Sequence, residues 1–500
     1  MATAQQRPPT PATDSATPAG AELSPRLYNS DLAPTKAAGR SWGAYNVFTL
    51  WGNDVHSLGN YAFAIGLFAL GMSVWDILIA FAIASVLLFV LLNLSGRMGH
   101  RTGVPFPVMS RIAFGVRGSQ LPAVVRGAAA IAWFGIQTYL ASQVLRTLIT
   151  ALWAGAADYD KNAILGLSTL GWISFLFLWL VQVLIVSFGM QAIRRYMAVA
   201  APTVLVTVLA LAVWMFTKAD MSIALDNGEP FTGGAKWLHI FEAAALWVVV
   251  YGTFVLNFCD FTRSAKSPRS ITRGNLIGIP VNMLFFAVIA AVLSGAQFRL
   301  DGEVITSPTD IVRTIPSTIL LALACLALLM LTVAVNLLAN FVAPVYMLVN
   351  LFPQRLDFRS AGVVSALVGL VILPWNLYDS PVAVTYFLGG LGALLGPVFG
   401  VVMADYWLLR KAQINVPHLY SEDPEATYHY RRGINPKAVG AFVPSAAIAV
   451  VIALVPFFSG VSGFSWFIGA AIAAALYWVL SDRTQTFEHI DGEAIAVAAE

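Results

Sequence analysis

Residues 51–60, WGNDVHSLGN, lie in the middle of an apolar segment at 47–70. They place a carboxylate, an imidazole, two amides and two glycines inside a segment long enough to cross a bilayer as a helix. Polar groups at membrane depth are costly, and irregular backbone is tolerated there only where it lines a cavity or is buried in protein. We therefore predict a broken helix at a binding site, and we expect the glycines at either end of the string to ease its local unwinding. The alternative is a polar seam that only holds neighbouring helices together.

The composition of the whole chain agrees with a membrane location. Of 500 residues, 58% are hydrophobic and 11% are charged, and the mean hydropathy is +0.75. A soluble domain carries roughly 25% charged residues, so this chain has too little polar surface to face water on all sides. The two cysteines, Cys259 and Cys325, fit no metal-ligand spacing, and we expect no cofactor.

Long apolar runs recur along the chain and predict an all-α integral membrane protein with about twelve spans. The predicted spans are 47–70, 72–96, 121–151, 163–189, 196–217, 238–259, 272–297, 314–350, 360–376, 382–409, 438–458 and 460–481.

The distribution of Lys and Arg predicts the orientation, because cytoplasmic loops are enriched in these residues. The loops assigned to the cytoplasm contain most of them, namely Arg97, Arg101, Arg111, Arg117, Arg126, Arg194, Arg195, Arg263, Lys266, Arg269, Arg273, Arg355, Arg359, Arg410, Lys411, Arg431, Arg432 and Lys437. The opposite loops contain only Lys161, Lys218, Lys236, Arg299 and Arg313. We expect a multi-pass protein of the cytoplasmic (inner) membrane with both termini in the cytoplasm.

Two further spans carry polar pairs at helical spacing. Trp133 and Gln137 are four residues apart, and so are Asn336 and Asn340. Residues four apart share one face of a helix. A tryptophan face beside an amide suits a flat, polar, uncharged ring, and an amide pair suits a ligand with alternating carbonyl and N–H groups. The alternatives are an ordinary buried tryptophan and interhelical hydrogen bonds.

The polar pairs occur in corresponding spans of two halves. The sixth span contains Tyr251 beside Gly252, where a second break is expected. Broken first and sixth spans, with polar pairs in the third and eighth, predict a five-plus-five inverted repeat that binds its substrate near the midplane. We assign 41–410 to this transport core, 411–437 to a cytoplasmic loop, 438–481 to two peripheral helices, and 1–40 and 482–500 to tails, the first of them disordered.

From about residue 27 to residue 436 the chain resembles the nucleobase–cation symporter-1 family. The resemblance rests on an ordered set of short motifs: LYNSDLAP at 27–34, VHS at 55–57, GVPFPV at 103–108 with Arg111, FG at 114–115, WFGIQ at 133–137, LN at 256–257, DFTR at 260–263, GP at 396–397 and DY at 405–406. It implies a leucine-transporter-type fold and substrates such as uracil, cytosine, allantoin, hydantoins or thiamine. It also implies that Trp133 stacks on the ring and that Gln137 and Asn340 hydrogen-bond it.

Two departures from the family pattern concern the pocket and the coupling ion. Tyr251 stands where the family usually has a second tryptophan, which changes the shape and polarity of the expected pocket. We expect the substrate to lie between the faces of Trp133 and Tyr251. Sodium-coupled members similar to this chain use carbonyls at the positions of Asn53 and His56 and hydroxyls at those of Ala334 and Val335. We infer a weakened sodium site, and we hypothesise coupling to H⁺ through Asp54 or His56, with Na⁺ as the alternative.

Other functions remain to be distinguished from this one. An amino-acid or amine transporter on the same fold would use Asp54 to hold an amine. A membrane-embedded enzyme would need a catalytic motif, and we find neither a metal-protease motif nor a nucleophile turn nor a phosphate loop. A channel would need a filter-like repeat or a ring of charges. We expect a monomer that contacts a small heterocyclic substrate and membrane lipid, with no nucleic acid as a partner.

Overall fold

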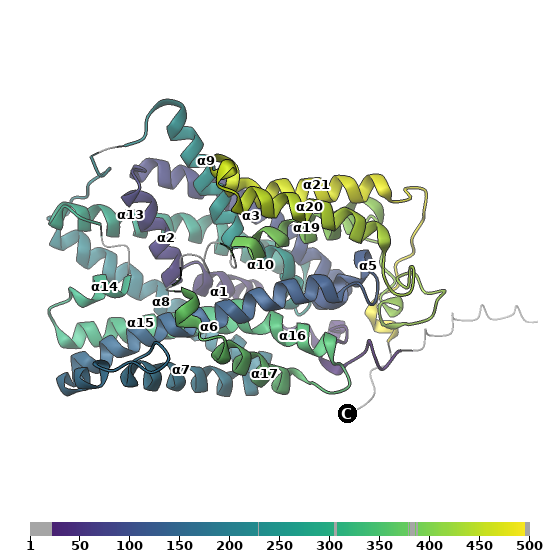
Figure 1. Ribbon diagram of the computed structural model, residues 1–500, viewed down its shortest axis with the longest axis horizontal. Coiled ribbons are helices and arrows are strands. Elements are labelled where there is room, and N and C mark those ends of the chain that lie inside the picture. Colours follow the sequence, from purple (N-terminus) through teal and green to yellow (C-terminus); the bar gives the residue numbers. More distant parts are fainter. Residues whose placement is uncertain are drawn as a thin grey trace, which may run out of the picture.

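The computed structural model describes residues 23–228, 230–304, 308–378, 380, 386 and 389–495. The long elements of this part of the chain are all helices, and most of them lie side by side along the longest axis of the molecule (Figure 1). The predicted all-α membrane class is confirmed.

Eight helical segments in the described part are long and apolar enough to cross a membrane. Seven of them are uninterrupted or continue through a π-helical turn, and the eighth begins as a 3-10 turn at Pro456. They are Val74–Thr102, Thr169–Ser187, Met190–Lys218, Pro268–Asp301, Thr318–Leu351, Gly389–Leu409, Pro436–Leu454 and Pro456–Leu480. The other four predicted spans fall on α6 (Gln120–Leu152) and on three interrupted helices. Of the predicted tenth span, residues 382–385 and 387–388 lie outside the described part.

The first group of packed helices contains the broken first and sixth spans. Its members are α1 (Ala44–Asp54), α2 (Leu58–Ala69), α3 (Val74–Thr102), α9 (Gly233–Val250), α10 (Gly252–Asn257), α11 (Cys259–Thr262), α12 (Pro268–Leu276) and α13 (Asn282–Asp301). Within it α3 packs on α9 and α13, α2 packs on α13, and α1 packs on α12.

The second group is built around α6. Its other members are α7 (Thr169–Ser187), α15 (Thr318–Asn336), α16 (Val342–Leu351), α17 (Phe358–Val371) and α18 (Pro374–Tyr378). Helix α6 packs on α7, α15, α16, α17 and α18. These are the third, fourth, eighth and ninth predicted spans, so each group takes its helices from both halves of the sequence.

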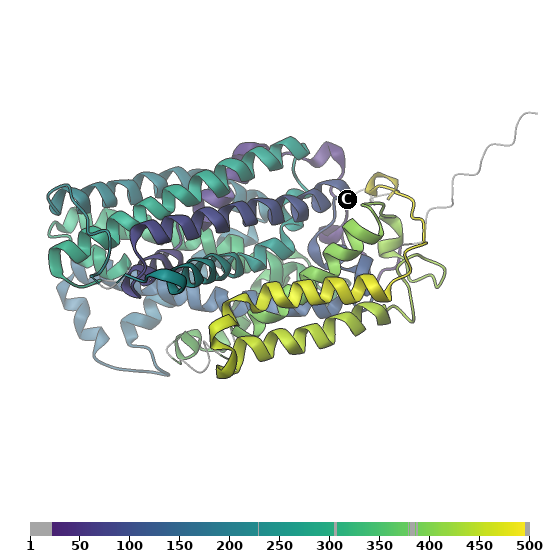
Figure 2. The same cartoon turned by 90° about the horizontal axis from the view of Figure 1, so that it is seen from above.

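The remaining helices connect or flank these groups. Helix α8 (Met190–Lys218) contacts α1, α13 and α15, and so touches both groups. The last three long helices, α19 (Gly389–Met403), α20 (Pro436–Leu454) and α21 (Ser465–Leu480), pack on one another. Figure 2 shows α20 and α21 as a pair along one edge of the molecule. The short helices are α4 (Phe106–Met109), α5 (Arg111–Phe114) and α14 (Pro308–Arg313).

The predicted break in the first span is confirmed, but its cause differs from the one expected. Helix α1 ends at Asp54, and the Ser57 side chain caps α2 by accepting from the Asn60 backbone N–H. The Asn60 Nδ2 atom donates to the carbonyls of Asp54 and Val55, at 3.0 and 3.2 Å, which the break leaves without helical partners. Gly52 lies inside α1, where a Cβ would come within 3.1 Å of Ala201. It serves close packing rather than unwinding.

The sixth and eighth spans are interrupted in different ways. The sixth breaks at Tyr251, between α9 and α10, as its glycine beside an aromatic residue predicted. It is interrupted again at Phe258, which was not predicted. A Cβ on Gly252 would lie 3.0 Å from Trp466 Nε1, so α10 approaches α21 closely. The eighth span runs on through a π-helical turn, Leu337–Phe341, which contains Asn340.

The structure corrects two predictions, one about the place of Arg126 and one about the N-terminal tail. Arg126 was expected in a cytoplasmic loop, but it lies within α6 and is 2% exposed. The predicted disordered tail 1–40 is packed from residue 23 onward, where Leu32 is fully buried and its carbonyl accepts from the Tyr420 hydroxyl at 2.6 Å. Residues 1–22 lie outside the described part.

Segments near the two described ends of the chain contact each other. The Ala37 backbone N–H donates to Glu493 Oε1 at 2.6 Å. Both ends therefore lie on the same side of the helical body, as an even number of spans requires. That this side faces the cytoplasm stays a prediction.

Candidate functional site

A cavity of about 440 Å³ lies where the breaks in the first and sixth spans meet α6 and α15. Its size is in the range of small-molecule binding sites. The lining combines apolar side chains with a few polar ones. The polar lining residues are Asp54, Ser57, Asn60, Gln137, Thr253 and Asn340, and the aromatic ones are Phe63, Trp133 and Phe254.

Trp133 and Gln137 both line this cavity from α6, as the four-residue spacing predicted. The Trp133 side chain is 37% exposed although it lies in a spanning helix, which leaves its ring open to the cavity. The Gln137 Oε1 atom is buried and has no hydrogen-bond partner among the described residues. An unpaired buried amide oxygen is costly, so a ligand that donates to Gln137 would remove that cost.

The eighth-span amides occupy different positions. Asn340 lines the cavity, and its Nδ2 donates to Asn336 Oδ1 at 3.0 Å. Asn336 is not among the lining residues, and its own Nδ2 donates to Phe134, Thr138 and Gln182. The structure therefore contradicts the prediction that both amides face the substrate, because the local helix directs only Asn340 into the cavity.

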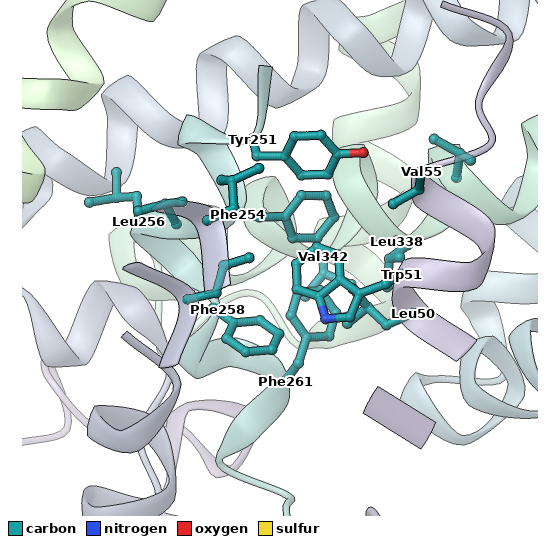
Figure 3. Close-up of a cluster of buried hydrophobic side chains, with 14 of the residues drawn as sticks. Leu50, Trp51, Val55, Tyr251, Phe254, Leu256, Phe258, Phe261, Leu338 and Val342 are labelled. Atoms are coloured by element: carbon teal, nitrogen blue, oxygen red, sulfur yellow. The ribbon is translucent and has the colours of Figure 1, made fainter. Parts of the chain in front are cut away.

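Tyr251 also lies behind the cavity wall. Its side chain is fully buried, with ring centroids 6.2 Å from Trp51 and 5.5 Å from Trp247. Figure 3 shows the ring extending toward Val55 at the end of α1, next to Phe254 and Trp51. The expected sandwich of a substrate between Trp133 and Tyr251 is not the arrangement seen, because the break turns Tyr251 toward α1.

The Tyr251 hydroxyl instead connects the two broken spans. It accepts a hydrogen bond from Asn60 Nδ2 at 3.1 Å and forms another with the carboxylate of Asp54. Asp54 lines the cavity and is 7% exposed. It is the only ionisable side chain among the described lining residues, so the site offers one carboxylate and no fixed positive charge.

The other predicted coupling residues of the first span are used in packing. His56 is fully buried, with Nδ1 2.8 Å from the Tyr61 hydroxyl and Nε2 3.0 Å from Asn282 Oδ1. Asn282 Nδ2 donates to the Trp51 carbonyl, so its Oδ1 faces His56, which assigns the imidazole proton to Nε2. Both ring nitrogens of a neutral His56 are therefore satisfied.

Asn53 is fully buried too, and its Nδ2 donates to the carbonyls of Thr49 and Met197 at 2.7 and 3.0 Å. Its Oδ1 has no hydrogen-bond partner within the part of the chain that the structure describes. Ala334 and Val335 are buried in α15, and of these two Val335 lines the cavity. Neither supplies an oxygen from its side chain.

Several lining residues had been missed. Asn60 belongs to the polar string at 51–60 and Thr253 to the predicted sixth-span break, so both carried a signal. Phe63 and Phe254 carried none, because an aromatic residue in an apolar span looks the same whether it faces lipid, core or cavity. The buried Arg126 was missed because an arginine at the edge of an apolar run resembles a loop residue.

The cavity lies between two broken helices, where two groups of packed helices meet, and further helices flank these groups. This arrangement defines a transporter of the leucine-transporter type. The fold agrees with the structure of Mhp1, a nucleobase-cation-symport-1 family transporter, in a closed conformation with bromovinylhydantoin bound. The TM-score is 0.75 at 24% identity, over 91% of this chain and 95% of that one. A sodium-coupled sialic acid symporter has the same fold, with a TM-score of 0.62 at 11% identity over 91% and 94% of the two chains.

Sequence comparison identifies the family. The pattern of the family described as "Permease for cytosine/purines, uracil, thiamine, allantoin" matches residues 34–469. The allantoin permease of Bacillus subtilis is 34% identical over 92% of this chain and 94% of its own length. The putative allantoin permease of Escherichia coli is 31% identical over 92% and 96%. The chain belongs to the nucleobase–cation symporter-1 family of permeases, so it is a multi-pass membrane transporter and not an enzyme.

Proposed function

We propose that this permease takes up allantoin or a closely similar ureide, coupled to the inward movement of a proton. The proposal rests on the cavity between the broken spans, in which an aromatic face and amide groups stand beside a single carboxylate. Similarity to the B. subtilis protein named allantoin permease supports the choice among the heterocycles of the family.

The chemistry of the lining suits a flat, uncharged, N–H-rich ring. Trp133 offers a face for stacking, and the free amide of Gln137 offers both a donor and an acceptor. No Lys or Arg stands among the described lining residues, so the site holds no positive partner for an anionic ligand. We expect the ring to lie against Trp133 with its polar edge toward Gln137 and Asn340.

Transport follows from two arrangements of the same helices. The group containing the broken spans and the group around α6 meet at the cavity, so rocking one group against the other opens it alternately to the two sides. Substrate and cation shift this equilibrium only by the difference in their affinity for the two states.

We assign the proton to Asp54 rather than His56. Asp54 faces the cavity, whereas both ring nitrogens of His56 are engaged with Tyr61 and Asn282. A sodium ion at the site used by related transporters would lack two oxygens, because Ala334 and Val335 have no hydroxyl. The unpartnered Oδ1 of Asn53 is the observation that favours sodium, since Na⁺ needs oxygen ligands.

Uptake of radiolabelled allantoin, uracil and benzylhydantoin in cells expressing this chain tests the proposal, each compound with and without sodium. We expect saturable allantoin uptake that is independent of sodium and lost when the proton gradient is dissipated. Strict sodium dependence would refute proton coupling, and saturable uptake of uracil alone would refute the ureide assignment. Competition by amino acids or amines, but not by allantoin, would favour the rival in which Asp54 binds an amine.

A further inference from the structure

A chain of hydrogen-bonded amides runs from α7 through α15 to the cavity wall. Gln182 in α7 and Asn336 in α15 are each 1% exposed, and Asn340 ends the chain at the cavity. The distances are 2.7 Å from Asn336 Nδ2 to Gln182 Oε1 and 3.0 Å from Asn340 Nδ2 to Asn336 Oδ1. Neither Gln182 nor Asn336 touches the cavity.

Backbone carbonyls fix which way the two inner amides point. Gln182 Nε2 donates to the Leu178 carbonyl at 3.1 Å, so its Oε1 must face Asn336. Asn336 Nδ2 donates to the Phe134 carbonyl at 3.0 Å as well as to Gln182, so its Oδ1 must face Asn340. A carbonyl can only accept, so turning either amide over would set oxygen against oxygen in a buried place.

Thr138 reinforces this direction. Its hydroxyl donates to the Phe134 carbonyl at 2.8 Å and accepts from Gln182 Nε2 and Asn336 Nδ2 at 3.1 and 3.0 Å. Because its single proton is already committed, the hydroxyl can act only as an acceptor toward the two amides. Reversing Gln182 or Asn336 would therefore lose this contact too.

We propose that Gln182 and Asn336 are positioning residues that set the hydrogen-bond polarity of Asn340, so that Asn340 presents its Oδ1 to the substrate and reads an N–H. The Nδ2 of Asn340 is held by Asn336 Oδ1, which leaves its oxygen for the cavity. Gln137 is under no such constraint, because its Oε1 has no partner in the described protein. One wall amide is thus held with its oxygen toward the cavity, and the other is free to match the neighbouring group.

This inference rests on the proposed function and narrows it to ligands with an imide edge, in which one N–H lies between two carbonyls. The hydantoin ring of allantoin has such an edge, and so does uracil. The N–H would donate to Asn340 Oδ1, and a flanking carbonyl would accept from Gln137 Nε2. Creatinine and cytosine carry the inverted edge, in which that ring nitrogen accepts and one flanking carbonyl is replaced by an amine.

The test measures competition against labelled allantoin uptake by two matched pairs, 1-methylhydantoin with creatinine and uracil with cytosine. In the wild type, the member with the imide edge should compete better by on the order of 10- to 100-fold, because the inverted edge leaves Asn340 Oδ1 facing another acceptor. Asn336→Leu releases the Asn340 amide to turn. The competition ratio, which is the potency of the ligand with the imide edge divided by that of its partner, should fall at least several-fold toward one. Gln182→Met should lower it by less.

Thr332→Val is the matched control. Thr332 is buried in α15, the helix of Asn336, and its hydroxyl donates to the Leu328 carbonyl of that helix at 2.8 Å. This variant should keep the wild-type ratio even if its uptake falls. A ratio does not depend on the amount of folded protein, so it separates positioning from general stability.

Two results would overturn this inference without touching the proposed function. One is equal competition within both pairs in the wild type, and the other is an unchanged competition ratio in Asn336→Leu with reduced uptake. If Asn336→Leu is not recovered in the membrane, an unchanged ratio in Gln182→Met overturns it. Absence of allantoin and hydantoin uptake by the wild type would instead refute the proposed function, and the inference with it.

Discussion

The Arg126 Nη2 atom donates a hydrogen bond of 2.8 Å to the carbonyl of Ala339, the residue before Asn340. The same guanidinium donates from Nε to the Thr253 carbonyl and to Asn257 Oδ1, at 3.3 and 3.2 Å. Thr253 and Ala339 both line the cavity, so one buried cation ties α6 and the eighth span to the broken sixth span beside this cavity.

Because these bonds join the two groups of helices, they must rearrange when the groups rock. We predict that Arg126→Met reduces allantoin uptake by at least about tenfold, since each buried hydrogen bond to a charged group contributes about 1.5–3 kcal/mol. Arg126→Lys keeps the charge but not the fork of donors, and it should recover only part of the rate. The measurement is initial uptake per amount of protein in the membrane.

Arg97→Gln serves as the control, because Arg97 is exposed at the end of α3. Its uptake should equal that of the wild type. Full activity of Arg126→Met would show that the contacts made by Arg126 do not constrain transport.

Trp133→Ala should abolish measurable uptake while leaving a folded protein. Stacking of a base on an aromatic side chain is worth about 1–3 kcal/mol, and the partly exposed Trp133 ring contributes little to the core. Trp75→Ala is the matched control, since Trp75 is 61% exposed and does not line the cavity. Binding of allantoin to purified protein with wild-type affinity in Trp133→Ala would remove this ring from the site.

The sequence predicted the breaks and the Trp133–Gln137 pair because each depends on local chemistry. The polar groups of a polar string in an apolar span must find hydrogen-bond partners nearby. Asn60 provides such a partner for the carbonyls of Asp54 and Val55. Residues four apart on an uninterrupted helix share a face whatever surrounds them. For α6 that face is the cavity wall.

The sequence did not predict which way Tyr251, Asn336 and Arg126 point. The direction of Tyr251 depends on the backbone at the break between α9 and α10, and that of Asn336 on acceptors supplied by α6 and α7. Arg126 is stabilised inside the protein by carbonyls of α10 and the eighth span. Such partners are distant in sequence and leave no periodic pattern. The packed segment 23–40 was missed for the same reason, since it is held largely through backbone carbonyls.

Asp54→Asn should uncouple transport from the proton gradient. The amide keeps the size of the carboxylate and its contact with the Tyr251 hydroxyl but carries no titratable proton. We expect loss of concentrative uptake with retained exchange of labelled for unlabelled allantoin across the membrane. The comparison of net uptake with exchange in vesicles measures this, and concentrative uptake in Asp54→Asn would assign the coupling ion elsewhere.

Tyr251→Phe tests the hydroxyl that links Asn60 and Asp54. The ring packing on Trp51 and Trp247 is kept, so the protein should be recovered in normal amounts. Loss of the hydroxyl leaves Asn60 Nδ2 and the Asp54 carboxylate each with one bond fewer, at a cost of about 1 kcal/mol. We expect uptake to fall several-fold, with less effect on competition by the imide ligands. A larger effect on ligand competition than on rate would instead indicate direct contact between Tyr251 and substrate.

Outside the membrane spans, Glu422 links the packed segment 23–40 to the loop 411–437. The Ser24 hydroxyl donates to Glu422 Oε2 at 2.7 Å, and Arg117 Nη2 lies 3.4 Å from Oε1. The hydrogen bond from Ser24 and the one from Arg117 hold the pKa of Glu422 below its ordinary value.

A carboxyl with a lowered folded-state pKa stabilises the fold fully above its ordinary pKa, and this contribution is lost as the pH falls through the lowered value. The contribution is at most about 1 kcal/mol, because the pair is partly exposed. We predict that hydrogen-exchange protection of residues 24–32 decreases in acid in the wild type. In Glu422→Gln the protection of these residues should already be lower than in the wild type at neutral pH, and it should decrease less in acid. Equal protection of the two proteins at neutral pH would show that Glu422 does not hold this segment in place.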